Sequence, residues 1–224
     1  MLDDKRIRII IGHYGSGKTE FAVNYAVKLA EAGKKVALID LDIVNPYFRS
    51  REKQDMLESK GVKVIASSLN IKVGVDLPAL AAGILGPIQD ESYDVILDVG
   101  GDAVGARALA RYYKYFKEGV YDMFCVLNAY RPGTRNVEDA IAHIKAIEKE
   151  SRTKVTGLIN NTHLLRETSV EDVLKGQELA KGVSEKLNLP IKYVSTLEKV
   201  ARLLPKDLEG EIFPISMYMR EDWM

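Results

Sequence analysis

Short apolar runs alternate with amphipathic segments along the whole chain. Most positions inside each run are apolar, without the every-second-residue alternation of a half-exposed sheet, and this is typical of strands covered on both faces. The predicted strands are residues 7–11, 35–41, 62–67, 95–99, 123–127, 155–160 and 191–195. The segments between them carry apolar residues at helical spacing, and the predicted helices are residues 17–32, 50–60, 77–89, 103–117, 134–150 and 170–187.

Strands that alternate with helices predict an α/β fold in three layers, with a mostly parallel central sheet of about seven strands and helices on both faces. No linker, repeat or low-complexity segment interrupts the pattern, so we expect residues 1–224 to form a single domain. Parallel sheets bind ligands at the carboxyl ends of their strands. The residues that follow each predicted strand are therefore the first place to look for function.

The loop after the first predicted strand, residues 12–19, reads GHYGSGKT and leads into a helical pattern. It matches every fixed position of the phosphate-binding pattern GxxxxGK[ST], in the strand–loop–helix context that this motif requires. The glycines let backbone N–H groups form a nest for a phosphate, Lys18 can reach the β- and γ-phosphates, and the Thr19 hydroxyl can complete a Mg²⁺ shell. The chain is therefore predicted to bind a nucleoside triphosphate in a P-loop NTPase fold. The positions predicted to contact it are Gly12, Tyr14, Gly15, Ser16, Gly17, Lys18, Thr19 and Glu20.

Acidic residues follow the second and fourth predicted strands. Asp40 and Asp42 alternate at the end of the second strand, which puts both carboxylates on one face. Asp98 ends the fourth strand and leads into VGGD, residues 99–102, which looks like a Walker B aspartate followed by a DxxG turn. A carboxylate at that position can hold a Mg²⁺-bound water, and a glycine of the turn can offer its N–H to the γ-phosphate.

These positions lead to specific roles. Lys18 and Asp42 are the predicted catalytic residues, and Asp42 is predicted to orient the attacking water or accept its proton. Thr19, Asp40 and Asp98 are predicted to hold the metal. Backbone contact with the γ-phosphate is predicted for Gly101, with Gly100 as the alternative.

Two other interpretations of the aspartates stay open. Asp98 could cap the helix that follows it, although Asp102 fits that role better. Asp40 and Asp42 could instead stabilise the turn before Pro46.

Charge and cysteine content limit the partners. The 32 Lys and Arg residues balance the 32 Asp and Glu residues, so no global field favours nucleic acid or an anionic membrane. The single cysteine, Cys125, lies inside an apolar run, where we expect a core residue, and it has no disulfide partner. The start, MLDDKRIRIIIG, lacks the long apolar core of a secretory signal, and no segment reaches the length of a membrane span. We therefore expect a cytoplasmic protein that does not bind membranes.

Two further apolar segments need an interpretation. Residues 110–117, ARYYKYFK, interleave bases and aromatic rings. At helical spacing Tyr112, Tyr115 and Phe116 form an apolar stripe while the lysines reach solvent, so nucleic-acid binding is not expected. The C-terminal residues 213–224 are apolar for a disordered end, and we expect them to dock on the body of the protein or on a partner.

The phosphate loop at residues 12–19, the DxD at residues 40–42 followed by Pro46, and the aspartate–glycine turn at residues 98–101 resemble the MinD/ParA-like (SIMIBI-class) P-loop ATPases, of the CobQ/CobB/MinD/ParA nucleotide-binding domain type. The similarity spans most of the chain. It implies the fold of that class and a Mg²⁺-dependent ATP site. Members of the class include cell-division and plasmid-partition ATPases, metallocentre maturation ATPases, ligases and kinases.

One position departs from the resembled class. Many members carry a second lysine directly after the first glycine of the loop, and this lysine reaches the nucleotide of the partner subunit in a sandwich dimer. This chain has His13 there, which is shorter and mostly neutral at pH 7. A nucleotide-driven homodimer then needs another cation, and the residues hypothesised to supply it are Arg49, Arg51, Arg131 and Arg135.

The sequence also bears on the choice of base. A guanine site is expected to show Asn-Lys-x-Asp after a strand, but the sixth predicted strand ends in NNTH, residues 160–163. The resemblance implies that an asparagine at this strand end contacts adenine, so Asn160 or Asn161 is predicted to bind the base and ATP is favoured over GTP. A simple asparagine turn is the alternative for either residue.

Three functions are compatible with these features. The leading one is an ATPase switch, in which hydrolysis of ATP resets residues 40–49 and 98–102 and changes the affinity for an unidentified protein partner. The second is a small-molecule kinase or ATP-dependent ligase, with an acceptor held by residues 67–76 and 128–136, where arginines suit anionic groups. The third is a scaffold that binds the nucleotide without hydrolysing it.

Overall fold

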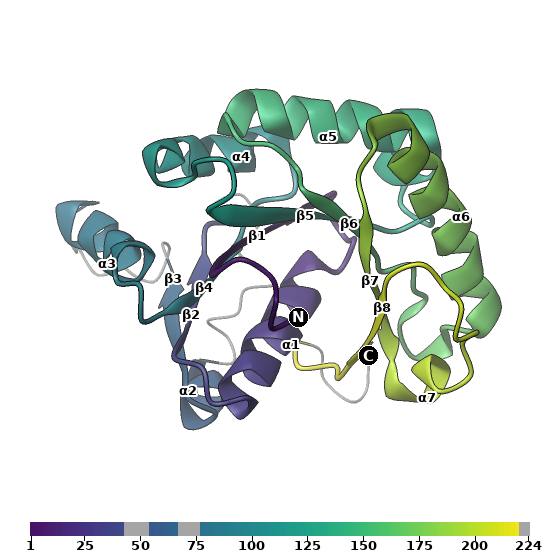
Figure 1. Ribbon diagram of the computed structural model, residues 1–224, viewed down its shortest axis with the longest axis horizontal. Coiled ribbons are helices and arrows are strands. Elements are labelled where there is room, and N and C mark those ends of the chain that lie inside the picture. The colour runs from purple at the N-terminus through teal and green to yellow at the C-terminus, as the bar shows by residue number, and fades with distance from the viewer. Residues whose placement is uncertain (43–53, 67–76, 220–224) are drawn as a thin grey trace.

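The computed structural model describes residues 1–42, 54–66 and 77–219. Eight strands form one sheet in the order β3-β2-β4-β1-β5-β6-β7-β8, and each neighbouring pair runs parallel. The strands are β1 (Ile7–Gly12), β2 (Val36–Asp40), β3 (Val62–Ala66), β4 (Asp94–Asp98), β5 (Tyr121–Leu127), β6 (Gly157–Asn160), β7 (Ile191–Leu197) and β8 (Glu211–Ile215). The predicted parallel α/β fold is confirmed, with one strand more than predicted (Figure 1).

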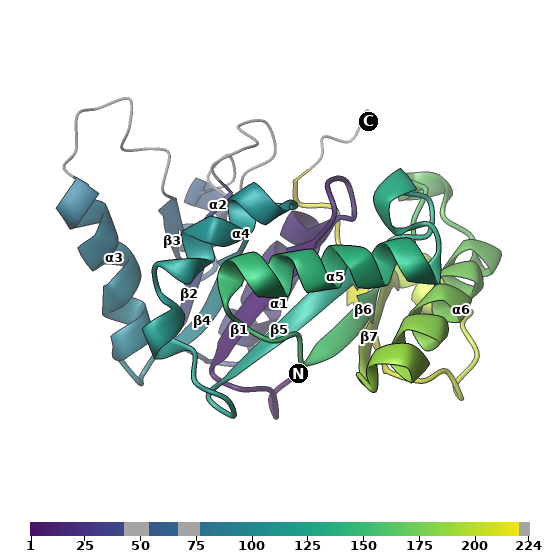
Figure 2. The same ribbon diagram turned by 90° about the horizontal axis from the view of Figure 1, so that it is seen from above.

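Helices cover both faces of the sheet and give the three predicted layers (Figure 1, Figure 2). One face carries α1 (Lys18–Glu31) and α2 (Gln54–Ser59). The other face carries α3 (Leu77–Gln89), α4 (Ala103–Ala110), α5 (Val137–Ser151) and α6 (Val170–Leu187). The short α7 (Glu198–Ala201) packs beside β7 and β8.

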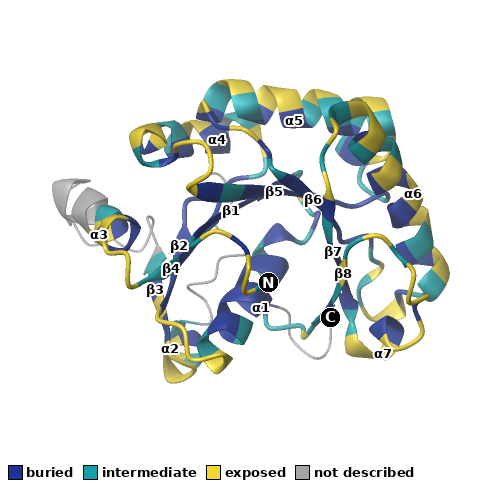
Figure 3. Cartoon of the chain, in the orientation of Figure 1, coloured by how far each residue is buried: buried dark blue, intermediate teal, exposed yellow. Residues whose placement is uncertain are grey.

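Successive side chains of β1 enter the two apolar cores. Ile9 and Ile11 belong to the core under α3 to α6, and Ile10 belongs to the core under α1 and α2. The strands are buried almost throughout, while the outer faces of the helices are exposed (Figure 3). Cys125 on β5 is fully buried, as predicted, and burial raises the pKa of its thiol to about 12.

The sequence pattern does not predict β8. Its five residues, EIFPI, include Pro214, which has no N–H to donate to a sheet. The strand forms because it occupies an edge of the sheet, beside β7, where a proline is tolerated.

The helix predicted over residues 103–117 is shorter than expected. α4 ends at Ala110, because the backbone N–H of Tyr112 bonds to the carbonyl of Leu109, three residues back, and a 3₁₀ turn, η2 (Tyr113–Tyr115), follows. Tyr112 and Phe116 are nevertheless buried, and the lysines of this segment are exposed. The prediction of a core-facing aromatic stripe is therefore confirmed.

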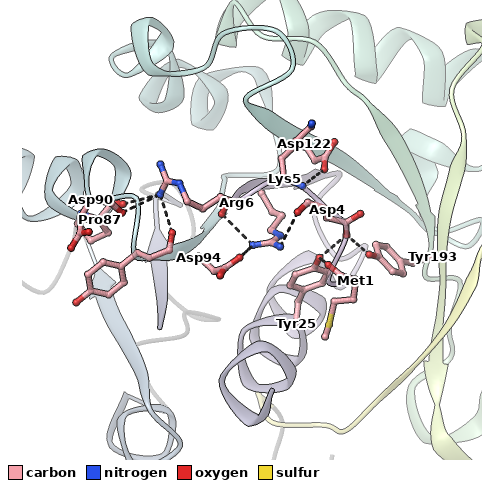
Figure 4. A network of polar contacts seen from close by, with 12 residues as sticks. Met1, Asp4, Lys5, Arg6, Tyr25, Pro87, Asp90, Asp94, Asp122 and Tyr193 are labelled. Carbon is pink, nitrogen blue, oxygen red and sulfur yellow. Dashed lines mark hydrogen bonds and ion pairs between the residues drawn. The ribbon is translucent and has the colours of Figure 1, made fainter. Parts of the chain in front are cut away.

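A polar network ties the N-terminal residues to the amino ends of the strands (Figure 4). Arg8 is buried on β1, forms an ion pair with Asp94 and donates to the carbonyl of Asp4 at 3.2 Å. The Asp4 carboxylate accepts hydrogen bonds from the hydroxyls of Tyr25, at 2.6 Å, and Tyr193. This network lies at the edge of the sheet opposite the loop that follows β1 (Figure 2).

Candidate nucleotide-binding site

The predicted phosphate loop connects β1 to α1 at the carboxyl edge of the sheet (Figure 2). Gly15 and Gly17 adopt left-handed backbone conformations, with φ of 75° and 85°, that residues with a Cβ rarely adopt. Gly17 is the N-cap of α1, so the positive end of the helix dipole and its free N–H groups face the loop. The local structure is therefore the anion-binding arrangement that the motif predicts.

The two residues predicted to be catalytic lie together. Lys18 Nζ is 3.7 Å from Asp42 Oδ2, and both side chains are buried. Asp40 Oδ1 accepts a hydrogen bond from the backbone N–H of Asp42 at 2.9 Å, which fixes the turn at the end of β2. This hydrogen bond holds the backbone at Asp42, whose side chain faces the lysine.

Asp98 lies beside Asp40 in the register of β4 and β2 and is buried. Burial raises the pKa of Asp98 to about 6, against the lowering effects of the Lys18 charge and the Thr19 hydroxyl. Its Oδ1 has no hydrogen-bond partner within the described part of the chain. A buried carboxylate oxygen without a hydrogen-bond partner fits a hard divalent cation such as Mg²⁺.

The turn after β4 packs against the phosphate loop. A Cβ added to Gly101 would lie 2.8 Å from the backbone nitrogen of Tyr14 and 3.0 Å from the carbonyl oxygen of Gly12. Only glycine allows this approach. The structure therefore places Gly101 directly against the loop whose ligand it is predicted to sense.

The cap of α4 is Asp102. Its side chain accepts a hydrogen bond from the backbone N–H of Gly105 at 2.7 Å, as predicted. The alternative interpretation of Asp98 as the helix cap is therefore wrong.

A cavity of about 290 Å³ opens beside the loop. One end is polar and is lined by Tyr14, Gly15, Gly17, Lys18, Thr19, Glu20, Asp42 and Arg131. Asn161 and His163 lie next to Gly17 of the loop, and the other end is mostly apolar and is lined by Leu165, Thr168, Thr196, Leu197, Ile215, Met217 and Met219. A polar end for phosphates and an apolar end for a ring system match the two halves of a nucleotide. Of the predicted site residues, Gly12, Ser16, Asn160, Gly101 and the metal-binding candidates Asp40 and Asp98 lie outside this lining.

The two adjacent asparagines have different surroundings. Asn160 is engaged by the protein: its amide donates to the Val173 carbonyl and the Gln177 side chain, and its oxygen accepts from the backbone N–H of Thr162. Asn161 lines the cavity. Its Nδ2 donates to the Ser16 carbonyl at 2.8 Å, and its Oδ1 is buried without a partner among the described residues.

The sequence predicted that the C-terminal segment docks, and its described part packs on the body of the protein, but it did not predict the contribution of β7 to the apolar end or that of the C-terminal segment. Thr196 and Leu197 end β7, and the residues after β8 close the far side. The Thr196 hydroxyl is buried and has no hydrogen-bond partner in the described ranges. The position of Thr196 at the carboxyl end of a strand was the available signal, together with the unusually apolar C-terminal segment.

His13 points away from the cavity. Its ring packs edge-on against that of His143 on α5, with centroids 5.5 Å apart. Burial lowers the pKa of His143 to about 4, helped by the nearby His13 and Lys18.

Unlike His13, Arg131 lines the cavity, and its Nε donates to the Gly15 carbonyl at 2.8 Å. Arg135 is exposed after the 3₁₀ turn η3 (Pro132–Thr134).

Other predictions fall on residues outside the described ranges. These are the turn at Pro46, the arginines Arg49 and Arg51, the acceptor segment 67–76, and the last residues, 220–224.

The fold and the site together define a P-loop nucleotide-binding protein of the SIMIBI class. The family model of the CobQ/CobB/MinD/ParA nucleotide-binding domain matches residues 7–175. The chain belongs to this family.

Solved structures with the same fold include the cell division protein FtsY from Thermotoga maritima, which is 21% identical with a TM-score of 0.58 over 87% of this chain and 62% of that one. The signal recognition particle receptor FtsY from Elizabethkingia anophelis is 22% identical, with a TM-score of 0.56 over 93% of this chain and 62% of its own. FtsY from Mycoplasma mycoides is 21% identical, with a TM-score of 0.54 over 85% of this chain and 60% of its own. The aligned part is thus about three-fifths of each of these proteins, and the likeness at these identities concerns the fold.

None of the helices in residues 1–42, 54–66 and 77–219 combines the length and the apolar character needed to cross a bilayer.

Proposed function

We propose that the protein is a Mg²⁺-dependent, ATP-binding switch that hydrolyses ATP and thereby changes its affinity for a protein partner. The observation that carries this proposal is the cavity, which joins a phosphate loop to a buried amide oxygen, Oδ1 of Asn161. A cluster of aspartates and Lys18 stands at the phosphate end.

In this proposal the loop N–H groups and the N-terminus of α1 bind the phosphates, and Lys18 neutralises the β- and γ-phosphates. Thr19, Asp40 and Asp98 hold Mg²⁺, which supplies positive charge to the phosphate oxygens. Asp42 orients the attacking water or accepts its proton. The Gly101 turn, which already touches the loop backbone, changes its position when the γ-phosphate leaves.

The surroundings of Asn161 favour adenine. One Nδ2 hydrogen of Asn161 is used by the Ser16 carbonyl, and its buried Oδ1 is an acceptor without a partner among the described residues, which is proposed to pair with the exocyclic amino group of adenine. Guanine sites use a carboxylate to accept from the base. The carboxylates on the described lining are those of Glu20 and Asp42, and they contact the C-terminal backbone and Lys18 instead.

Arg131 is proposed to supply, within its own subunit, the cation that His13 cannot. Its side chain already lies against Gly15 in the cavity, so it requires no second subunit to reach the phosphates. The proposal also includes nucleotide-driven formation of a homodimer, to which the protein partner responds.

The test is phosphate release from ATP and, separately, from GTP with Mg²⁺, together with the mass of the protein with and without nucleotide. Slow hydrolysis of ATP is expected, with a loss of at least about 100-fold in Lys18→Ala because the lysine stabilises the transferred phosphoryl group. The matched control is Lys34→Ala, an exposed lysine just after α1, and wild-type rates are expected there.

Other outcomes separate the alternatives. A preference for GTP would overturn the role given to Asn161. Turnover that rises sharply only when a small-molecule acceptor is added would identify a kinase or ligase, and tight ATP binding without phosphate release under any condition would identify a scaffold.

A further inference from the structure

From the last residue of β8 onward, the chain returns to α1. We call residues 215–219 the C-terminal strap. It passes alongside the first turns of α1 (Figure 1), and its Ile215, Met217 and Met219 line the apolar end of the cavity. Met219 is buried and belongs to the same core cluster as Phe21 of α1.

Two side chains of α1 fasten the strap by its backbone. Asn24 pairs with Ser216 in both directions: its Nδ2 donates to the Ser216 carbonyl at 2.8 Å, and its Oδ1 accepts from the Ser216 N–H at 2.7 Å. Glu20 accepts hydrogen bonds from the backbone N–H groups of Tyr218 and of Met219, the latter at 3.1 Å. These contacts hold main chain, so they fix the course of the strap whatever its side chains are.

Glu20 therefore joins two parts of the site. It directly follows Lys18 and Thr19 in the first turn of α1, where the phosphates are proposed to bind, and its carboxylate holds the wall where the base is proposed to bind. A carboxylate in the first turn also interacts favourably with the helix dipole. Glu20 was predicted to contact the nucleotide, and these hydrogen bonds support an indirect role through the strap.

We propose that the strap is a wall of the base site, with Met217 and Met219 packing against one face of a purine ring and Leu165 and Leu197 lining the rest, and that Glu20 is the positioning residue that holds the wall. This inference rests on the proposed function and adds to it the part of the chain that binds the base. Methionine suits such a wall, because its flexible, polarisable side chain makes favourable contacts with aromatic rings.

If the strap binds the base, its contribution to ATP affinity can be measured separately from that of the phosphate loop. A nucleoside triphosphate uses both ends of the cavity, whereas inorganic tripolyphosphate uses only the phosphate end. Damage to the strap is therefore expected to weaken ATP binding and to leave tripolyphosphate binding unchanged.

The experiment measures binding of ATP and of tripolyphosphate, each with Mg²⁺, by calorimetry on the full chain. Glu20→Ala is expected to raise the Kd for ATP about 10-fold or more and to change the Kd for tripolyphosphate less than about 2-fold. Glu20→Gln, which keeps an acceptor oxygen, is expected to retain most of the ATP affinity. Glu31→Ala, an exposed glutamate at the other end of α1, is the matched control and is expected to bind both ligands as wild type does.

A second pair of variants guards against a folding defect. Met217→Ala is expected to weaken ATP binding selectively, and Met217→Leu to restore it, with unfolding midpoints close to wild type because Met217 is only half-buried. The inference is overturned if Glu20→Ala binds ATP normally, or if it loses ATP and tripolyphosphate equally. A wild-type protein that binds neither ligand would instead overturn the proposed function.

Discussion

At the scale of single residues, adjacent and chemically identical side chains have different surroundings. Asn160 has each of its amide hydrogen bonds within the protein, whereas Asn161 gives one to the phosphate loop and has a buried oxygen without a partner among the described residues. The sequence pattern NNTH could place an asparagine at the strand end but could not choose between the two. The choice depends on which side of β6 faces α6, and strand periodicity alone does not settle this at a strand terminus.

This difference predicts opposite phenotypes. Asn160→Ala is expected to destabilise the fold by about 1–3 kcal/mol, because the Thr162 N–H and the Gln177 Oε1 would lose their buried hydrogen-bond partner. Asn161→Ala is expected to raise the Kd for ATP about 10-fold, with a smaller loss of stability. Urea unfolding and ATP titration of both variants check the pair, and equal ATP affinities in the two would contradict the assignment.

The arginines near η3 allow a second comparison. Arg131→Ala is expected to lower the rate of ATP hydrolysis about 10-fold or more, because the guanidinium lies in the cavity beside Gly15. Arg135→Ala removes an exposed charge four residues away and is expected to leave the rate unchanged. Single-turnover phosphate release measures both. Unaltered turnover in Arg131→Ala would remove the arginine from the mechanism.

At the scale of elements, the site depends on two turns that approach each other closely: the phosphate loop after β1 and the glycine turn after β4. Both strands are central in the sheet and pair directly, with Ile10 opposite Asp98. Register therefore sets which residues of the two turns meet, and the close approach leaves no room for a side chain at Gly101.

Gly101→Ala tests this approach. The added Cβ would lie 2.8 Å from the Tyr14 nitrogen, so the phosphate loop must shift, and the Kd for ATP is expected to rise at least about 10-fold. Gly86→Ala, in α3, adds the same methyl group where no described atom beyond the helix's own backbone and the neighbouring residues lies within 4 Å, and it is the matched control. ATP titration with a parallel thermal melt separates lost binding from lost folding; normal ATP affinity in Gly101→Ala would show that the two turns move independently.

Elements with strong periodicity were predicted well, and those set by tertiary context were not. The helices at residues 77–89 and 170–187 were predicted with the bounds that the structure shows, because their apolar spacing is continuous. β8 could not be predicted from its pattern, since its proline is tolerated only through its edge position. The phosphate end of the site came from a short local motif. The apolar end combines β6, β7 and the C-terminal strap, which lie far apart in sequence.

At the scale of the whole molecule, the two edges of the sheet differ in what their charges do. The carboxyl edge holds Lys18 and Asp42, which line the cavity, and the buried Asp98, and the amino edge holds the Arg8 and Asp4 network (Figure 4). Burial alone raises the pKa of Asp4, but hydrogen bonds from Tyr193 and Tyr25, with the Lys192 ammonium 3.0 Å away, lower it below its ordinary value.

Asp4→Asn is therefore expected to lower the free energy of unfolding by about 3 kcal/mol at pH 7 and to leave the Kd for ATP unchanged. Because the folded-state pKa of Asp4 is lowered, its contribution is complete above the unfolded value near pH 4 and is lost as the pH falls through the folded value. The deficit of the variant is thus expected to shrink below pH 4. Urea unfolding at a series of pH values measures this, with Asp3→Asn, an exposed neighbour, as the control. A deficit independent of pH would mean that packing, not charge, is responsible.

The position of β1 also has a consequence for synthesis of the chain. It is the first strand in sequence but lies between β4 and β5, so neither neighbour exists when it leaves the ribosome. Translation at about 5–20 residues per second leaves roughly 4–17 seconds before β4 is complete. During that interval three consecutive isoleucines have no partner strand, and exposed apolar segments of this kind make a nascent chain prone to aggregation. Nucleotide can stabilise the newborn protein only after the turn at Gly101 has emerged.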